Sequence, residues 1–252
     1  MNSLKILKVK DPKGKINPLD AKLPENLPRH PFTKFIISPP RSGKSVLIAN
    51  ELANPAFYNS QEYWNTVYFC SPTQLFDKTA MNYLPKLENV IQIDDHLDLM
   101  RIDVLLESIM KSQMKLLTED DPVTGKKKEM ERICIVFDDC LGYLQNNESL
   151  SYFITKFRHF SCSVYITSQS FRKIPKVIRN CAGNVIFHKL ANEKELIAID
   201  EEYGCCFSPD FINMAKKITN KKYNFCYLNN EELKMYENYD NLILDAADEN
   251  VN

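Results

Sequence analysis

KFIISPPRSGKSVLIANEL, residues Lys34 to Leu52, is the stretch that decides the fold. Its apolar run Phe35–Ile37 predicts a short buried strand, and Val46–Leu52 predicts the start of a helix. The loop between them contains two prolines and ends in Ser-Gly-Lys-Ser. A strand, a loop ending in Gly-Lys-Ser and a helix form the context that a phosphate-binding P-loop requires.

The side chains of this loop have separate expected roles. Lys44 would reach the β- and γ-phosphates of ATP, and the Ser45 hydroxyl would hold Mg²⁺. Backbone N–H groups at the helix N-terminus would bind phosphate oxygens. The first position of the G-x-x-x-x-G-K-[ST] pattern is Ser38 instead of glycine, so an ordinary strand–turn–helix remains the alternative. The predicted nucleotide-binding residues are Ser38, Pro39, Pro40, Arg41, Ser42, Gly43, Lys44 and Ser45.

Composition and charge limit the number of domains and the kinds of partner that the chain can have. Its 252 residues suit one large domain or one domain with appendages, and 44% of them are hydrophobic, enough for a sizeable core. The net charge of −1 gives no global signature of nucleic-acid binding, so any DNA contact must come from local patches. The first fifteen residues carry five lysines against a single acid, whereas the charged residues from Glu237 onward are all acids. We expect both ends to be solvated tails.

The eight cysteines indicate a reducing compartment. They form no CxxC pair, and Cys70, Cys134 and Cys226 lie inside apolar runs, which is typical of buried, reduced thiols. We find no signal peptide and no apolar run that approaches the length of a membrane span, so we expect no membrane association.

Short apolar runs alternate with longer helical patterns from Lys34 onward. This alternation predicts an α/β fold with a mostly parallel central sheet, whose strands are buried on both faces, and with flanking helices. The predicted strands are Phe35–Ile37, Thr66–Cys70, Val90–Ile93, Ile133–Phe137, Val164–Thr167, Val185–Phe187 and Tyr223–Leu228. The predicted helices are Lys44–Ala53, Leu97–Leu117, Ser149–Phe160, Ile174–Asn180, Glu193–Tyr203 and Ser208–Lys217.

A second motif, ERICIVFDDC at Glu131 to Cys140, has the Walker B pattern. Its apolar residues would deliver Asp138 and Asp139 to the carboxyl edge of the sheet, where open α/β sheets bind ligands. Asp138 would hold Mg²⁺ through water or through Ser45, and Asp139 would polarise the attacking water. The alternative is a strand end with helix-capping aspartates.

A further predicted strand, Thr66–Cys70, lies between the two motifs along the chain. Together with the second acid, it favours the ASCE branch of ATPases over the kinase and GTPase branch. It disfavours a nucleotide kinase, which we would expect to show an arginine-rich lid.

The third motif is FRHFSCSVYITSQS, Phe157 to Ser170. Gln169 follows a predicted strand and is the candidate sensor of the γ-phosphate, with a strand-end turn as the alternative. Arg158 precedes that strand, at the opposite edge of the sheet, and so would not face its own nucleotide. It is a candidate arginine finger for a neighbouring active site, with a surface arginine as the alternative.

The segments SPPRSGKS, IVFDDC, RHFSCSVYITSQS and IRNCAGNVIF together resemble the FtsK/HerA-type DNA-packaging ATPases of large DNA viruses and virophages, the poxvirus A32-like group. The resemblance covers Lys34 to Lys189 and implies a RecA-like P-loop core. It implies that the protein hydrolyses ATP as an oligomeric ring that pulls double-stranded DNA into a capsid. Residue by residue, it implies that Lys44 and Ser45 bind the nucleotide and Mg²⁺. It makes Asp138 the Mg²⁺ residue, Asp139 the catalytic acid and Gln169 the sensor. It makes Arg158 the trans finger and Arg179 a second finger or sensor candidate.

The resemblance also implies partners and a location. The partners would be double-stranded DNA, further copies of the chain and viral capsid components; the location would be the host cytoplasm (the viral factory) or the virion. DNA held by its phosphates is bound independently of sequence and in a salt-sensitive way. The candidate DNA contacts are Lys126, Lys127 and Lys128, with a solvated loop as the alternative and Ser71–Lys86 as a rival segment.

The sequence divides into three predicted parts. Residues 1–33 form an N-terminal arm and strand, residues 34–232 the P-loop ATPase domain, and residues 233–252 an acidic C-terminal tail. Two other functions remain open. One is a P-loop ATPase for other DNA translocation or helicase work, and the other is a non-catalytic nucleotide-binding scaffold, which Ser38 suggests.

Overall fold

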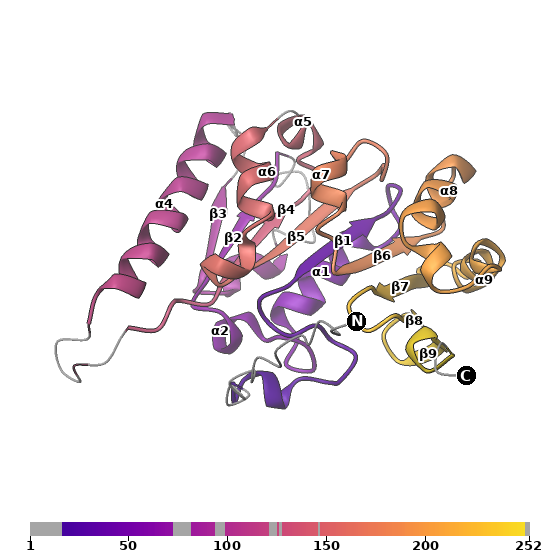
Figure 1. The fold of residues 1–252 in the computed structure, drawn as a ribbon, viewed down its shortest axis with the longest axis horizontal. Helices are drawn as coiled ribbons and strands as arrows, with labels where there is room; N and C mark the ends of the chain where they lie inside the picture. The colour runs from indigo at the N-terminus through magenta and orange to yellow at the C-terminus, as the bar shows by residue number, and fades with distance from the viewer. Residues whose placement is uncertain are drawn as a thin grey trace, which may run out of the picture.

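The computed structural model of the chain describes residues 17–72, 82–93, 99–120, 125, 128–145 and 147–249. Within these residues, nine strands form one sheet in the order β3-β2-β4-β5-β1-β6-β7-β8-β9 (Figure 1). The strands from β3 to β6 are parallel, and β7, β8 and β9 are added in antiparallel fashion. The strands are β1 (Thr33–Ile37), β2 (Thr66–Cys70), β3 (Val90–Ile93), β4 (Ile133–Phe137), β5 (Cys162–Ser168), β6 (Asn184–His188), β7 (Phe225–Asn229), β8 (Lys234–Glu237) and β9 (Asn241–Asp245).

The strand β1 lies in the middle of the sheet, between β5 and β6. Every residue of β1, β4, β5 and β6 is buried, as expected for parallel strands that are covered on both faces. The strand that separates β1 from β4 is β5, not β2. The strand expected at Thr66–Cys70 is present, but it pairs with the far side of β4.

Helices cover both faces of the sheet (Figure 1). Phe35 and Ile37 point to the face that carries α4, α6, α8 and α9, and Ile36 points to the face that carries α1, because side chains alternate along a strand. The helix predicted over Ser149–Phe160 is interrupted, because α6 ends at Ile154 and a 3₁₀ turn, η4, follows at Phe157–Phe160. The α-helices are α1 (Lys44–Ala53), α2 (Ser60–Tyr63), α4 (Leu99–Thr118), α5 (Leu141–Leu144), α6 (Glu148–Ile154), α7 (Lys176–Arg179), α8 (Glu193–Glu202), α9 (Phe211–Ile218) and α10 (Ala246–Glu249); the remaining 3₁₀ turns are η1 (Asp20–Lys22), η3 (Leu84–Lys86) and η5 (Gly204–Cys206).

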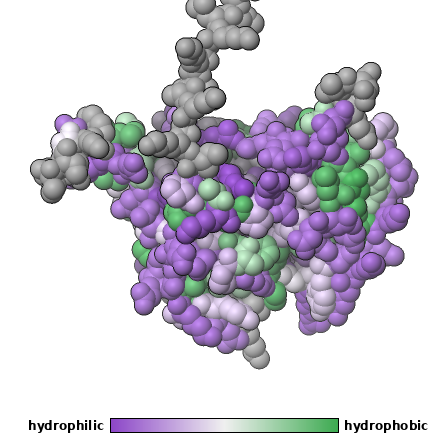
Figure 2. Space-filling view, turned by 90° about the horizontal axis from the view of Figure 1, so that it is seen from below, coloured by the Kyte–Doolittle hydropathy of each residue, from purple (hydrophilic) through white to green (hydrophobic). Residues whose placement is uncertain are grey.

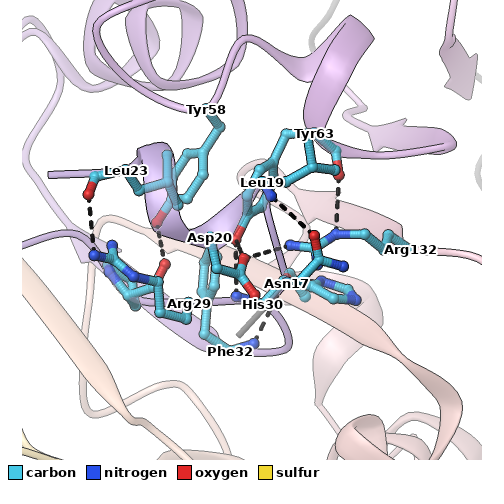
Figure 3. Close-up of polar contacts among 12 residues, drawn as sticks. Asn17, Leu19, Asp20, Leu23, Arg29, His30, Phe32, Tyr58, Tyr63 and Arg132 are labelled. Atoms are coloured by element: carbon cyan, nitrogen blue, oxygen red, sulfur yellow. Dashed lines mark hydrogen bonds and ion pairs between the residues drawn. The ribbon is translucent and has the colours of Figure 1, made fainter. Parts of the chain in front are cut away.

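The segment before β1 is held against the sheet by a polar network (Figure 3). Asp20 accepts a hydrogen bond of 2.6 Å from the Tyr63 hydroxyl and forms a 2.7 Å ion pair with Arg132. The buried ring of His30 lies 2.7 Å from the Ser163 hydroxyl through Nδ1. From residue 17 to residue 32 the segment contains the short turn η1 and no strand, so the strand expected in the arm is not found there; residues 1–16 lie outside the described part.

The C-terminal residues were expected to form a polar tail from residue 233, and the structure corrects this expectation. The strands β8 and β9 extend the sheet, and α10 follows them. The side chain of Met235 is fully buried and that of Tyr236 is nearly so, because β8 pairs with β7. The edge strand β9 exposes Leu242 and Ile243.

The surface in the view of Figure 2 is largely hydrophilic, and the thiols are free. In the part of the chain that is described, no helix has both the length and the apolar character needed to cross a membrane. Hydrophilic residues prevail on the face shown in Figure 2, and hydrophobic ones gather in separate patches. All eight cysteines lie among the described residues, and all are free thiols.

Candidate active site

The carboxyl ends of β1, β4 and β5 bring the predicted nucleotide-binding residues together. The P-loop follows β1, Asp138 and Asp139 follow β4, and Gln169 follows β5. These segments enclose a cavity of about 420 Å³. The cavity is lined by Ser38, Pro39, Pro40, Arg41, Gly43, Lys44, Ser45, Val46, Asp139, Gln169 and Tyr223.

The P-loop presents backbone N–H groups to this cavity. Gly43 is the N-cap of α1 and has a φ of 100°, a left-handed conformation that glycine adopts without steric cost. No side chain caps the helix, and the N–H groups of its first turn have no acceptor within the helix. Such an exposed helix N-terminus favours anions, and phosphate in particular.

Ser38 occupies the first P-loop position without strain. Ser38 does not have a positive φ; the left-handed residues of the loop are Arg41, with a φ of 63°, and Gly43. The Ser38 side chain is fully buried and hydrogen-bonds through Oγ to Nδ1 of His188 at 2.7 Å. Burial lowers the pKa of His188 to about 4, so its ring is neutral near pH 7. Glycine is therefore not required at this position.

The two acids that follow β4 contact the lysine of the predicted P-loop. Lys44 Nζ forms an ion pair with the Asp139 carboxylate and lies 3.5 Å from Asp138 Oδ1. Thr167 connects the acids, because its hydroxyl donates to Asp138 Oδ1 at 2.6 Å and accepts from the Asp139 N–H at 3.0 Å. Asp139 has a φ of 52°, which aspartate tolerates better than most residues. Thr167 of β5 thus positions the Asp138 carboxylate and the backbone of Asp139, whereas Lys44 holds the Asp139 carboxylate.

The residues of this site fit a nucleotide with Mg²⁺. The Ser42 hydroxyl oxygen is buried and has no hydrogen-bond partner among the described residues, so a ligand group would satisfy it. Ser45 and Asp138 supply the hydroxyl and carboxylate oxygens that Mg²⁺ prefers. Lys44 lines the cavity and pairs with both Asp138 and Asp139.

Arg158 lies away from this cavity, at the opposite edge of the sheet. It belongs to η4, which precedes the amino end of β5, whereas the cavity lies at the carboxyl end. The Arg158 side chain is 60% exposed and forms an ion pair with Glu231. An exposed guanidinium at this edge is accessible to a second molecule.

Arg179 uses its guanidinium within its own chain. It forms a two-point ion pair with Glu202, with distances of 2.6 and 3.0 Å, and donates to the carbonyl oxygens of Arg172 and Ile174. The group also lies 5.0 Å from the centre of the Phe171 ring. These contacts join α7 to α8 and leave Arg179 less available than Arg158 to a neighbour.

The lysine loop is described only in part. Lys126 and Lys127 lie outside the described residues. Residues 73–81 of the rival segment also lie outside them. Lys128 forms a 2.9 Å ion pair with Glu119, just after α4. Lys128 is therefore positioned beside an acid, and its contact with DNA stays a prediction.

Three further residues belong to the site and were not predicted. Thr167 positions both acids, His188 holds Ser38, and the Tyr223 ring lies against Gly43. A polar residue at the end of an apolar strand was the available signal for Thr167 and His188, as it was for Asp138. No pattern in the sequence indicates Tyr223, since its place depends on how the loop after α9 returns to the P-loop.

Comparisons with known proteins agree with this fold. No protein-family model and no curated protein matches the chain. Among solved structures, B204, the DNA-packaging ATPase from Sulfolobus turreted icosahedral virus, has a TM-score of 0.59 at 13% identity, over 82% of this chain and 97% of that one. The genome-packaging NTPase B204 from Sulfolobus turreted icosahedral virus 2, in complex with ATP-γS, has a TM-score of 0.55 at 12% identity, over 82% and 96%.

A further similar structure is that of a conjugation coupling protein. TcpA, the conjugation coupling protein of pCW3, has a TM-score of 0.51 at 14% identity, over 84% of this chain and 59% of TcpA. At such identities the likeness concerns the fold. The predicted fold class, an α/β fold with a mostly parallel central sheet and flanking helices, is confirmed, and this fold is shared with the ATPase B204.

Proposed function

We propose that this chain is an ATPase whose ring-shaped oligomer moves double-stranded DNA into a viral capsid. The observation that carries the proposal is the meeting of Lys44, Asp138 and Asp139 beside an open helix N-terminus. The fold shared with the DNA-packaging ATPase B204 supports the choice of packaging over other work.

The proposed chemistry is hydrolysis of the γ-phosphate of ATP. Lys44 exchanges its carboxylate partners for the β- and γ-phosphates, and the N–H groups of the first turn of α1 bind phosphate oxygens. Mg²⁺, held by Ser45 and Asp138, would neutralise phosphate charge. Asp139, released from Lys44, orients the attacking water and accepts its proton, and Gln169 contacts the γ-phosphate side of the cavity.

The proposed ring follows from the position of Arg158. A finger at the edge of the sheet opposite its own P-loop is useful only to a neighbouring copy. Head-to-tail contacts of this kind form a ring when the rotation between neighbours closes. Arg158 is exposed at that edge and Arg179 is not, so we place Arg158 first. In this arrangement Arg158 leaves Glu231 when it reaches the neighbour's nucleotide.

The proposed partners are double-stranded DNA and viral capsid components, in the viral factory of the host cytoplasm or in the virion. Lys126, Lys127 and Lys128 are the proposed DNA contacts, because three consecutive cations in one loop match a phosphate backbone. The net charge of −1 makes such a local patch necessary.

The test is the ATPase rate of the purified chain with and without double-stranded DNA, together with a strand-separation assay. We expect DNA to stimulate hydrolysis without separating strands, and the stimulation to fall with rising salt. Strand separation would favour helicase work. The fold of TcpA supports DNA transfer between cells as a second candidate, and dependence on single-stranded DNA would favour that candidate. Nucleotide binding without turnover would favour the third alternative, a non-catalytic nucleotide-binding scaffold.

A further inference from the structure

A second cavity borders the P-loop. It has a volume of about 580 Å³ and shares Ser42 and Gly43 with the nucleotide-binding loop. Its volume is within the range of about 300 to 1,000 Å³ that is typical of small-molecule sites. Unlike the phosphate cavity, it is walled mainly by apolar and aromatic side chains, among them Val46, Phe57, His188, Tyr223, Phe225 and Tyr239.

Tyr223 borders both cavities, as do Gly43 and Val46. The residue is 58% exposed and has a φ of 70°, which is unusual for an aromatic residue. Its ring stands over Gly43, where a β-carbon would meet the ring at 3.4 Å. A large aromatic ring is thus held at the surface directly beside the phosphate loop.

The floor of the second cavity is rigid. The Tyr239 ring lies 5.6 Å from Phe57 and 5.2 Å from Phe225 in edge-to-face contacts. The Tyr239 hydroxyl donates to Glu51, whose carboxylate forms an ion pair with Lys34, and both of these charged side chains are fully buried. A floor tied to β1 and α1 in this way holds its shape when a ligand binds.

A third cavity, of about 310 Å³, also borders the P-loop but differs in charge. Its lining includes Arg41, Lys189, Lys221 and Lys222. Such a surface suits anions. An uncharged planar group is better placed in the aromatic cavity, where the rim carries the side-chain amides of Asn50 and Asn238 and the carboxylate of Asp240.

We propose that the aromatic cavity binds the purine base of the nucleotide and that Tyr223 is its stacking residue. The inference rests on the proposed function, since it assigns the base of the same ligand whose phosphates the P-loop would bind. Aromatic rings stack on bases, and a purine offers a larger face than a pyrimidine. The amides and the carboxylate at the rim provide partners for the polar edge of the base.

Binding of ATP and of tripolyphosphate, each with Mg²⁺, tests the inference by calorimetry. Tripolyphosphate has the phosphates without the base, so it reports on the P-loop alone. Tyr223→Ala should weaken ATP binding about 5- to 150-fold and leave tripolyphosphate binding unchanged. Tyr223→Phe keeps the ring and should bind ATP as the wild type does. Tyr152→Ala removes a tyrosine that is 51% exposed on α6, and serves as the matched control.

Nucleotide preference gives a second measurement. Wild-type protein should bind ATP more tightly than CTP, and Tyr223→Ala should reduce this difference. An unchanged affinity for ATP in Tyr223→Ala, or an equal loss for ATP and tripolyphosphate, overturns the assignment of the base. If the wild type binds neither compound, the proposed nucleotide site itself is wrong and the inference falls with it.

Discussion

The Ser38 hydroxyl lies 2.7 Å from Nδ1 of His188, and this hydrogen bond ties the first residue of the P-loop to the end of β6. Both side chains are buried. The His188 ring also lies 5.6 Å from Phe225, in the wall of the aromatic cavity. A serine where P-loops commonly have glycine is therefore part of the architecture of the site.

Ser38→Ala should lower the free energy of unfolding by about 1 to 3 kcal/mol, because the buried ring nitrogen of His188 loses its partner. Urea denaturation measures the loss. In a double-mutant cycle with His188→Ala, the combined loss should be smaller than the sum of the single losses, since each variant removes the same hydrogen bond. Additive losses would contradict a direct interaction between the two side chains.

Stability should fall in mild acid because of His188. Burial lowers the pKa of the His188 side chain from 6.5 to about 4, so between these pH values the unfolded state binds more protons than the folded state. The contribution is fully present above about pH 6.5 and is lost as the pH falls toward 4, with a slope of up to about 1.4 kcal/mol per pH unit. Urea denaturation midpoints at about pH 7 and at about pH 4.5 measure this loss of stability.

The control for the acid effect is His188→Asn, whose amide oxygen replaces Nδ1 but does not titrate. Its stability should depend less on pH over the same range. His30, whose pKa burial lowers to about 3, should make a second, separate contribution from the other edge of the sheet. Parallel pH profiles for wild type and His188→Asn would contradict the assignment to His188.

The sequence predicted the P-loop, the two acids and the six parallel strands because each depends on a local pattern. An apolar run followed by polar residues marks a strand end, whatever the rest of the chain does. The pair Ser38 and His188 is different, since 150 residues separate its members and only the neighbouring positions of β1 and β6 bring them together.

The strands β8 and β9 were missed for a related reason. The segment from residue 230 onward is rich in aspartate, glutamate and asparagine, which is the composition of a polar tail. The two strands are ordered because β7 supplies a hydrogen-bonded edge on which β8 can pair, and β8 in turn holds β9. Pairing between distant strands is not visible in local composition.

Asp139→Asn should bind ATP and Mg²⁺ normally but lose turnover. Asparagine tolerates the positive φ of residue 139, so the backbone and its hydrogen bond from Asp139 N–H to Thr167 should persist. Asp138 would still hold the metal, whereas the attacking water would lose its base. Nucleotide binding by calorimetry and the ATPase rate give the two measurements.

The reciprocal variant distinguishes the two acids. Asp138→Asn should weaken Mg²⁺ binding, because an amide oxygen replaces a charged ligand. If Asp138→Asn spares metal binding and Asp139→Asn destroys it, the roles of the two residues are reversed.

Arg158→Ala should bind ATP normally and hydrolyse it poorly, with a loss on the order of 10³ or more if Arg158 is a trans finger. The structure supplies a matched control, because the Arg158 side chain forms an ion pair with Glu231. Glu231→Ala removes that ion pair and keeps the arginine, so its turnover should not fall. An equal loss in both variants would show that Arg158 acts through its own chain.

Mixed oligomers give the decisive test of the Arg158 finger. A Lys44→Ala chain keeps Arg158, and an Arg158→Ala chain keeps its P-loop. Mixed together, the two inactive chains should regain part of the activity, because some interfaces would then combine an intact P-loop with an intact finger. A cis-acting arginine predicts no recovery, and a surface arginine predicts no defect to rescue. Native mass spectrometry of differently tagged chains establishes that both occupy one oligomer, so that absence of recovery in such oligomers contradicts a finger supplied in trans.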